Sequence, residues 1–185
     1  MITEKITEQN QPELEKITRI LLGPGPSMVH PRILQAIPSP MIGHLDPYFL
    51  KIMNKTQEML RYVFQTKNKL TIPVSGTGSA AMEASIANFV ESDTPVLICI
   101  NGFFGNRFLD IAHRYCSNVE SIQRPWGEVF SPDEIMSALK KKPARVVAIV
   151  HAETSTGARQ PLDDIGKIVH ENGGILIVDA VTSLG

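Results

Sequence analysis

The amino-acid sequence predicts an α/β fold in three layers, α/β/α, with a mostly parallel sheet between two layers of helices. Two observations support this prediction. Short runs of apolar and often β-branched residues recur along the chain without alternating polar positions, which is typical of strands buried on both faces. Segments with helical spacing of apolar residues separate these runs, and such a strand–helix rhythm indicates a parallel sheet. The length of 185 residues fits about one domain.

The first part of the chain predicts an arm, a rigid turn and one helix. Residues 1–20 mix acidic and basic side chains and lack the apolar stretch of a signal peptide, so we expect a solvated arm. Glycine and proline alternate over residues 23–26, which excludes a helix or a central strand there. Asp46 can cap a helix that begins at Pro47. We expect the apolar stripe of this helix to pack in the core. The stripe consists of Phe49, Ile52, Met53, Leu60, Val63 and Phe64.

Strands and helices are expected to alternate from residue 70 onward. The expected strands are Leu70–Val74, Val96–Ile100, Val119–Gln123, Arg145–Val150 and Ile175–Val178. The expected helices are Ser79–Glu91, Arg107–Cys116, Pro132–Lys141 and Leu162–Glu171. The start of the third of these helices is marked by a capping residue, Ser131, and by two acidic residues in its first turn.

The composition argues against several classes of protein. Hydrophobic residues make up 43% of the chain and charged residues 20%, which excludes intrinsic disorder. The net charge of −1 provides no basic surface for a nucleic acid. The longest apolar runs are far shorter than the ~20 residues of a membrane-spanning helix, so we expect no membrane partner. The two cysteines, Cys99 and Cys116, are too few for a disulfide scaffold, and we expect buried thiols in a cytoplasmic protein.

Parallel sheets bind ligands at the carboxyl ends of their strands, and residues 75–79 follow the first expected strand. Their sequence, Ser-Gly-Thr-Gly-Ser, places glycines and hydroxyl groups at the start of a helix, which suits a phosphate group. The segment also fits part of the dinucleotide-binding fingerprint. That fingerprint requires an acidic residue at the end of the next strand, where this chain has Asn101. A nicotinamide-dinucleotide-binding module and a purely structural turn are therefore weaker alternatives.

Three further strand ends carry unusual residues. After the second expected strand, Phe104 can either stack on a flat heteroaromatic ring or plug the edge of the core. Residues 151–157 concentrate hydroxyl and ionisable groups, but their His-x-Glu pattern lacks the cysteine pair of a zinc deaminase, and we expect no metal site. Asp179 ends an apolar strand, where a carboxylate needs a cationic partner unless it caps a following helix. A phosphate cradle, a stacking ring and a carboxylate at one sheet edge match the needs of pyridoxal phosphate.

With these motifs, the sequence resembles the class V aminotransferases of pyridoxal-phosphate fold type I, and among them the alanine–glyoxylate and serine–pyruvate aminotransferases. The resemblance implies that residues 21–185 form the N-terminal part of the large, cofactor-binding domain, after an N-terminal arm of residues 1–20. It also implies that the cofactor is pyridoxal 5'-phosphate. The resemblance depends on residues 22–27, 41–44, 62–66, 75–78, 101–102, 151–157, 160–162, 178–179 and 183–185.

The resemblance implies roles for single residues. The cofactor-binding residues would be Thr77, Gly78, Ser79, Phe104, Thr154, Asp179 and Val181. The first three would hold the phosphate group. Phe104, where relatives usually have tryptophan, would lie on the ring face, Thr154 near the ring hydroxyl and Val181 beside the ring.

Asp179 is the catalytic residue that the resemblance assigns to this chain, because it would pair with the pyridine nitrogen. Gly25 and Pro26 would help to wall the substrate site. The family's Schiff-base lysine lies a couple of dozen residues beyond the matched aspartate, past Gly185. We therefore expect these residues to be the half of the enzyme that lacks the lysine, inactive alone and cut from a longer protein.

The function implied by the resemblance is transamination, with alanine or serine as the amino donor and glyoxylate or pyruvate as the acceptor, in a full-length homodimer. A non-catalytic fragment is an alternative. A cysteine desulfurase is disfavoured because it needs a mobile catalytic cysteine, whereas Cys99 lies in an expected strand.

The resemblance also predicts the arrangement of the sheet. The four later strands are expected side by side and parallel in the order 175–178, 145–150, 96–100 and 119–123. The first strand, Leu70–Val74, is expected to run in the same direction without a partner strand in this chain, because the intervening strands of the family follow later in the sequence.

Overall fold

The computed structural model describes residues 19–184 of the protein, which divides into two compact units, Met1–Pro40 and Met41–Gly185. Most of the expected arm, residues 1–20, lies outside the described residues. The described part of the first unit contains one short helix, α1 (Pro31–Ala36), which the sequence did not predict. His30 caps this helix, because its Nδ1 accepts a hydrogen bond from the backbone N–H of Arg32 at 3.2 Å.

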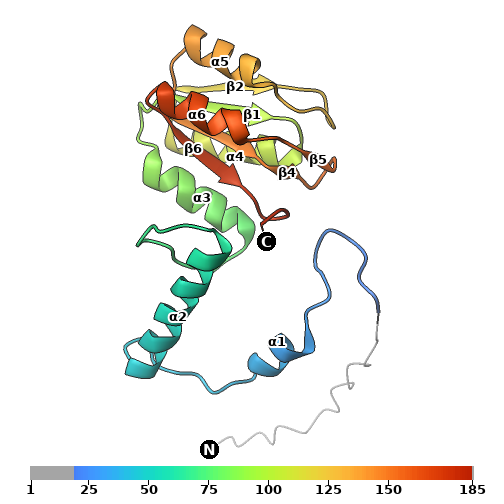
Figure 1. Ribbon diagram of the computed structural model, residues 1–185, viewed down its shortest axis with the longest axis vertical. Helices are drawn as coiled ribbons and strands as arrows, with labels where there is room; N and C mark the ends of the chain where they lie inside the picture. The colour runs from blue at the N-terminus through green and yellow to red at the C-terminus, as the bar shows by residue number, and fades with distance from the viewer. Residues whose placement is uncertain (1–18, 185) are drawn as a thin grey trace, which may run out of the picture. The chain divides into compact units, whose positions relative to one another are not determined.

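The second unit is built on a four-stranded parallel sheet (Figure 1). Its strands are β1 (Val96–Ile100), β2 (Val119–Gln123), β3 (Val146–Val150) and β6 (Ile175–Asp179). They lie in the order β2-β1-β3-β6, and each neighbouring pair is parallel. The predicted order and direction of these four strands are thereby confirmed, together with the α/β class.

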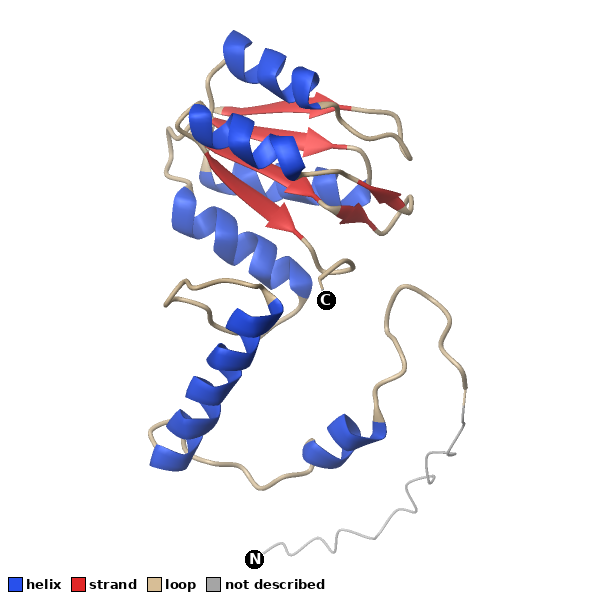
Figure 2. Ribbon diagram, viewed as in Figure 1, coloured by secondary structure: helices blue, strands red, loops and turns tan. Residues whose placement is uncertain are grey.

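Helices cover both faces of this sheet (Figure 2). The helices are α3 (Gly78–Phe89), α4 (Phe103–Tyr115), α5 (Pro132–Lys141) and α6 (Asp163–Glu171). Neighbouring residues of β1 point to opposite faces of the sheet. Ile98 packs with α3 and α4 in one apolar cluster, whereas Leu97 and Cys99 pack with α5 and α6 in a second cluster. All five residues of β1 and of β3 are buried, which explains their unbroken apolar sequence.

The helix α4 begins four residues earlier than the sequence predicted, at Phe103 instead of Arg107. The glycines around Phe104 favour a turn when they are considered alone. In the structure, a side chain from a distant part of the chain caps the helix and allows the first turn to form. This capping side chain belongs to Glu153 and is described with the site.

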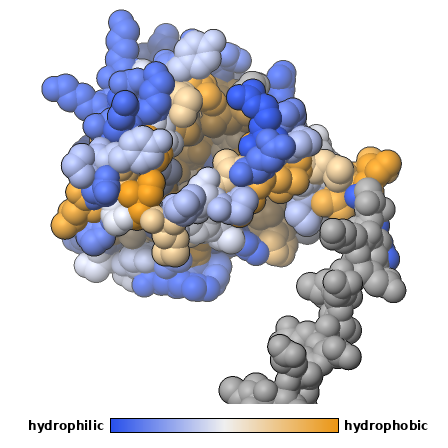
Figure 3. All heavy atoms as spheres, turned by 90° about the horizontal axis from the view of Figure 1, so that it is seen from below, coloured by the Kyte–Doolittle hydropathy of each residue, from blue (hydrophilic) through white to orange (hydrophobic). Residues whose placement is uncertain are grey.

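The helix α2 (Pro47–Val63) confirms the predicted cap, since Asp46 Oδ1 accepts a hydrogen bond from Tyr48 N–H at 2.7 Å. The prediction that its apolar stripe packs in the core is wrong. None of its residues is buried, and Ile52 and Val63 are 42% and 43% exposed. Figure 3 shows hydrophobic side chains open on one face of the molecule, among polar ones. Helical spacing identifies a face that favours burial, and no described element covers this one.

The segment Leu70–Val74 forms no strand, so the prediction of a strand is wrong, whereas the prediction that it has no partner strand is confirmed among the described residues. Its backbone makes no hydrogen bond to another strand within residues 19–184. A strand requires a neighbour for its N–H and C=O groups, and the described residues provide none for this segment.

A short hairpin follows β3 and was not predicted. It consists of β4 (Ala152–Glu153) and β5 (Ala158–Arg159), which are antiparallel. Two-residue strands are too short to give a recognisable pattern of apolar residues.

Both cysteines are buried, as predicted, and burial raises the pKa of Cys99 to about 12. The Cys99 thiol is therefore protonated at neutral pH and is not a nucleophile. Within residues 19–184, no helix combines the length and the apolar character that crossing a membrane requires.

Candidate active site

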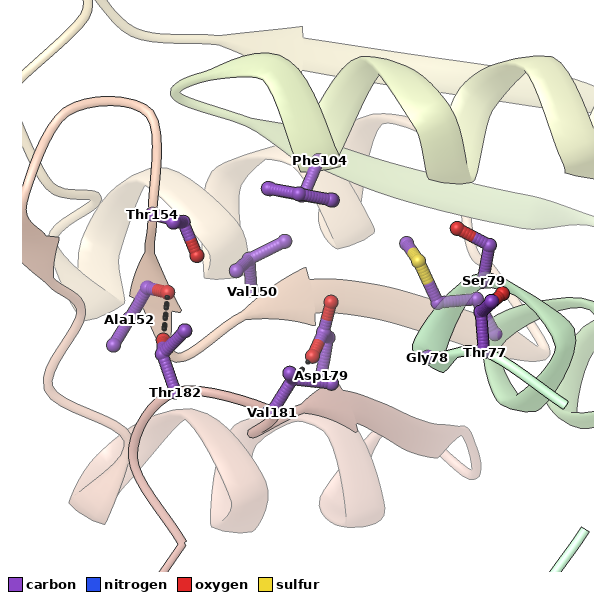
Figure 4. Close-up of a pocket in the computed structure, with 11 residues that line it drawn as sticks. Thr77, Gly78, Ser79, Phe104, Val150, Ala152, Thr154, Asp179, Val181 and Thr182 are labelled. Atoms are coloured by element: carbon purple, nitrogen blue, oxygen red, sulfur yellow. Dashed lines mark hydrogen bonds between the residues drawn. The ribbon is translucent and has the colours of Figure 1, made fainter. Parts of the chain in front are cut away.

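A pocket lies at the carboxyl ends of β3 and β6, beside the first turns of α3 and α4 (Figure 4). The turn before α3 contributes Thr77, α4 contributes Phe104, and the last residue of β6 contributes Asp179. All seven predicted cofactor-binding residues line this pocket, namely Thr77, Gly78, Ser79, Phe104, Thr154, Asp179 and Val181. The fold thus gathers in one place residues that are up to about a hundred positions apart in the sequence.

The N-terminus of α3 forms one side of the pocket and has free hydrogen-bonding groups. Thr77 is the N-cap residue, but its side chain makes no capping hydrogen bond. The backbone N–H groups of Gly78 and Ser79 donate to none of the described residues. Gly76 precedes this turn with a φ of +155°, and a Cβ there would lie 2.8 Å from Ala80 Cβ, so the turn requires glycine. Free N–H groups, hydroxyl groups and the positive end of the helix dipole together suit an anion.

Asp179 lies opposite Phe104 in the view of Figure 4, and its carboxylate points into the pocket. Its Oδ1 accepts a hydrogen bond from Val181 N–H at 3.0 Å, which fixes the orientation of the carboxylate. No basic side chain among residues 19–184 forms an ion pair with it. The same hydrogen bond caps the turn of residues 181–183, in which Leu184 N–H donates to the carbonyl of Ala180 at 3.0 Å, so the alternative role as a cap is present alongside the position in the pocket. The half-buried carboxylate is therefore available to a cation in the pocket.

Phe104 forms a wall of the pocket at the start of α4, and the buried carboxylate of Glu153 holds this helix end in place. Glu153 is 1% exposed. Its Oε2 accepts hydrogen bonds from the N–H groups of Phe104 at 3.1 Å and Gly105 at 3.3 Å. Its Oε1 accepts from Ser155 N–H at 3.1 Å and from Ser155 Oγ at 2.7 Å. A carboxylate at a helix N-terminus also interacts favourably with the helix dipole.

Glu153 thereby connects Phe104 on α4 to the hairpin that carries Thr154, which lies across the pocket (Figure 4). Sequence reasoning noticed its motif but gave Glu153 no role. In the sequence, Gly102 is the one local sign that another group comes close to the start of α4. A Cβ at this position would lie 2.3 Å from Glu153 Cγ, so only glycine allows the carboxylate to reach the helix end.

The other predicted site residues, Gly25 and Pro26, lie exposed in the first unit, and their role in a substrate site stays a prediction. Within the part of the chain that the structure describes, no group of three or more His, Cys, Asp or Glu side chains could hold a metal ion.

Comparison with known proteins decides the family. The family model "Aminotransferase class-V" matches residues 27–185. The chain belongs to the class V aminotransferase family. An alanine–glyoxylate aminotransferase from Nostoc sp. has a similar structure, with a TM-score of 0.92 and 56% sequence identity over 96% of this chain and 47% of that one.

Two curated relatives belong to the same group of enzymes. The (S)-ureidoglycine–glyoxylate transaminase of Bacillus subtilis is 44% identical over 90% of this chain and 40% of its own length. The alanine–glyoxylate aminotransferase of Mus musculus is 41% identical over 91% of this chain and 41% of its own length. The chain therefore spans about two fifths of the length of the curated relatives it matches.

Membership of this family implies pyridoxal phosphate as the cofactor, and the residues of the pocket fit it. The uncapped N-terminus of α3 suits the phosphate group, the flat ring of Phe104 suits a heteroaromatic ring, and the carboxylate of Asp179 suits a protonated ring nitrogen. The family membership also decides against the nicotinamide-binding alternative.

Proposed function

We propose that the chain forms the cofactor-binding part of an aminotransferase that transfers an amino group between a small amino acid and a small 2-oxo acid. The observation that carries the proposal is the convergence of the seven predicted residues on one pocket. Bound pyridoxal phosphate supplies an electron sink for the substrate carbon that loses its proton.

Each wall of the pocket has its own task in this proposal. The hydroxyl groups of Thr77 and Ser79 and the N–H groups at the start of α3 bind the phosphate and fix the position of the cofactor. The carboxylate of Asp179 keeps a proton on the ring nitrogen, because a negative charge in a half-buried site stabilises the protonated ring. This is the catalytic contribution of the described residues.

The remaining residues orient the ring and exclude water. Phe104 would cover one ring face, Val181 would lie beside the ring and Thr154 would donate toward the ring hydroxyl, since all three line the pocket. The apolar side chains of Met82 and Val150 complete the wall of the pocket. A low-polarity wall strengthens the electrostatic interaction between Asp179 and the ring.

The substrates proposed for the full-length protein are alanine or serine as donor and glyoxylate or pyruvate as acceptor. Glyoxylate appears in the names of both curated relatives and of the Nostoc enzyme, which supports it as the acceptor. The 56% identity to an alanine–glyoxylate aminotransferase supports alanine as the donor. The proposal also includes Gly25 and Pro26 as part of the substrate site, a homodimer, a Schiff-base lysine beyond residue 185 and a cytoplasmic location.

The test uses the full-length protein that carries this sequence, saturated with pyridoxal phosphate. With alanine and glyoxylate, we expect pyruvate to form, the activity to disappear when the cofactor is removed, and to return when it is added back. Serine and ureidoglycine, tested as alternative donors at equal concentration, rank the donor preference. A cofactor-saturated protein that transfers no amino group to glyoxylate or pyruvate from any of these donors would contradict the proposal.

A further inference from the structure

Arg107 connects two walls of the pocket, although neither the sequence nor the family motifs singled it out. It lies one turn after Phe104 on α4, and its Nη1 donates a hydrogen bond to Ser79 Oγ on α3. Its guanidinium carbon lies 5.1 Å from the ring centre of Phe103 and 5.5 Å from that of Phe104, within the range of cation–π interactions. The two rings meet edge to face, with centroids 5.3 Å apart.

The charge of Arg107 has no partner among the described residues. No carboxylate within residues 19–184 forms an ion pair with it, and its side chain is half-buried. Arginine stays protonated at any physiological pH, so the positive charge is permanent. A half-buried cation next to the N-terminus of α3 favours an anion at this end of the pocket.

The direction of the hydrogen bond determines what the Ser79 hydroxyl can do. A guanidinium group can only donate, so Ser79 Oγ accepts. The hydroxyl proton of Ser79 then remains for another acceptor, and it reaches none among the described residues. A hydroxyl that accepts a bond from a cation also becomes a stronger donor.

We propose that Arg107 is a positioning residue for the phosphate group of the cofactor, which directs and strengthens the Ser79 hydroxyl as a phosphate donor while it holds the ring of Phe104. The proposal rests on the proposed function, because it assumes that the pocket binds pyridoxal phosphate. A merely structural role, in which Arg107 only joins α3 to α4, predicts damage that is independent of the phosphate group.

The discriminating measurement is the ratio of the affinities for pyridoxal phosphate and for pyridoxal, which lacks the phosphate. Both are measured on the full-length protein by equilibrium dialysis. Because both ligands have the same ring and aldehyde, the ratio isolates the phosphate contribution. We expect Arg107→Met to lower the affinity for pyridoxal phosphate by roughly tenfold or more, the scale of a charge-assisted hydrogen bond. The affinity for pyridoxal should change far less.

Three further variants complete the experiment. Arg107→Gln replaces the charged side chain by a neutral polar one. It should lower the ratio of the two affinities as much as Arg107→Met does, so the test still decides if the methionine variant does not fold. Arg107→Lys keeps a positive charge and a hydrogen-bond donor. Its ratio of the two affinities should lie between those of Arg107→Met and the unaltered protein. Arg114→Met is the matched control on the same helix, because Arg114 is exposed and pairs with Asp110. It should leave both affinities unchanged.

The pairing with Ser79 is tested by a double-mutant cycle. Since Arg107 acts through the hydroxyl, Arg107→Met should cost much less affinity for pyridoxal phosphate in a Ser79→Ala protein than in the unaltered one. Additive losses would contradict the proposed pairing.

The outcomes separate the two proposals. If the unaltered protein binds pyridoxal phosphate but a folded neutral variant of Arg107 keeps the same affinity ratio, the role of Arg107 is wrong and the proposed function stands. A lysine variant as poor as the methionine variant would also contradict the role of the charge. If the unaltered protein binds neither ligand, the proposed function fails, and the role of Arg107 fails with it.

Discussion

The N-termini of α3 and α4 lie at the same pocket, but only that of α4 is capped by a side chain of the protein. The end of α4 is closed, because the buried carboxylate of Glu153 accepts two of its N–H groups. The end of α3 is open, because Thr77 provides no side-chain cap and two N–H groups have no acceptor among the described residues. A helix end that the chain leaves uncapped beside a pocket offers its N–H groups and the positive end of its dipole to an anionic ligand.

This contrast separates residues that hold the site together from residues that bind. Glu153 and Gly102 belong to the first group, since their contacts are all within the chain. Thr77 and Asp179 belong to the second group, since both line the pocket, the Thr77 side chain makes no capping bond, and only Oδ1 of Asp179 is bonded within the described chain. Substitutions in the first group should reduce stability, and substitutions in the second should reduce function without reducing stability.

The largest expected effect is on turnover, from a residue in the binding group. Asp179→Asn in the full-length protein should preserve the fold and lower turnover by several orders of magnitude, because a neutral amide no longer keeps the ring nitrogen protonated. Steady-state kinetics measure the loss, and a melting curve checks the fold. Near-normal turnover would remove Asp179 from the catalytic site.

The next effect is on stability, from the closed helix end. Glu153→Ala should lower the free energy of unfolding by about 2–4 kcal/mol, because it leaves the N–H groups of Phe104, Gly105 and Ser155 without this acceptor, and Gly105 is buried. The matched variant Glu153→Gln retains one acceptor oxygen and should lose less. Denaturant unfolding of both variants gives the values. An alanine variant as stable as the unaltered protein would mean that this helix end does not need its cap.

A smaller effect is expected at the uncapped end of α3, on cofactor affinity but not on stability. Thr77→Ala should weaken the binding of pyridoxal phosphate by roughly 1–3 kcal/mol, the scale of a hydrogen bond to a charged group. The unfolding free energy without cofactor should hardly change, since the Thr77 side chain caps nothing. Unchanged cofactor affinity would place the phosphate elsewhere, and a large loss of stability would contradict the contrast between the two helix ends.

The smallest effect comes from a helix far from the pocket, which provides a control. Ser131 caps α5 in a capping box with Glu134, and Ser131→Ala should cost about 1 kcal/mol of stability and leave cofactor affinity unchanged.

The capping box of α5 also predicts a pH dependence. The hydrogen bonds from the backbone N–H and the hydroxyl of Ser131 lower the pKa of Glu134. Because this pKa is lower in the folded state, the stabilisation is present above the unfolded pKa and is lost as pH falls through the folded one. The difference in stability between the unaltered protein and Ser131→Ala should therefore shrink in acid. Thermal melting of both proteins at several pH values measures it. A difference that grows in acid would contradict the assigned hydrogen bonds.

The sequence predicted the elements whose stabilising contacts are present in the described chain. The fully apolar strands β1 and β3 and the capped helix α5 formed where their patterns indicated, because burial and local capping act on those residues directly. The failures have a common cause. Leu70–Val74 and the stripe of α2 have suitable compositions, but the described residues provide no element that pairs with or covers them.

The candidate site was predictable where a residue belonged to a recognisable motif. Phe104 and Asp179 follow or end strands of the parallel sheet, whose carboxyl ends meet at one edge, and Thr77 belongs to a glycine-rich turn before a helix. Glu153 and Arg107 were missed because their roles depend on partners that are 49 and 28 positions away, at Phe104 and Ser79. Gly102 shows that something approaches the start of α4 closely, but the local sequence does not identify the partner.

The most direct test of the proposed site is a crystal structure of the full-length protein with pyridoxal phosphate bound. We expect the phosphate within hydrogen-bond distance of Thr77 and Ser79 at the open end of α3, and the ring nitrogen beside the carboxylate of Asp179. The end of α4 should remain capped by Glu153. A phosphate bound elsewhere, or a ring nitrogen far from Asp179, would contradict the assignment of this pocket.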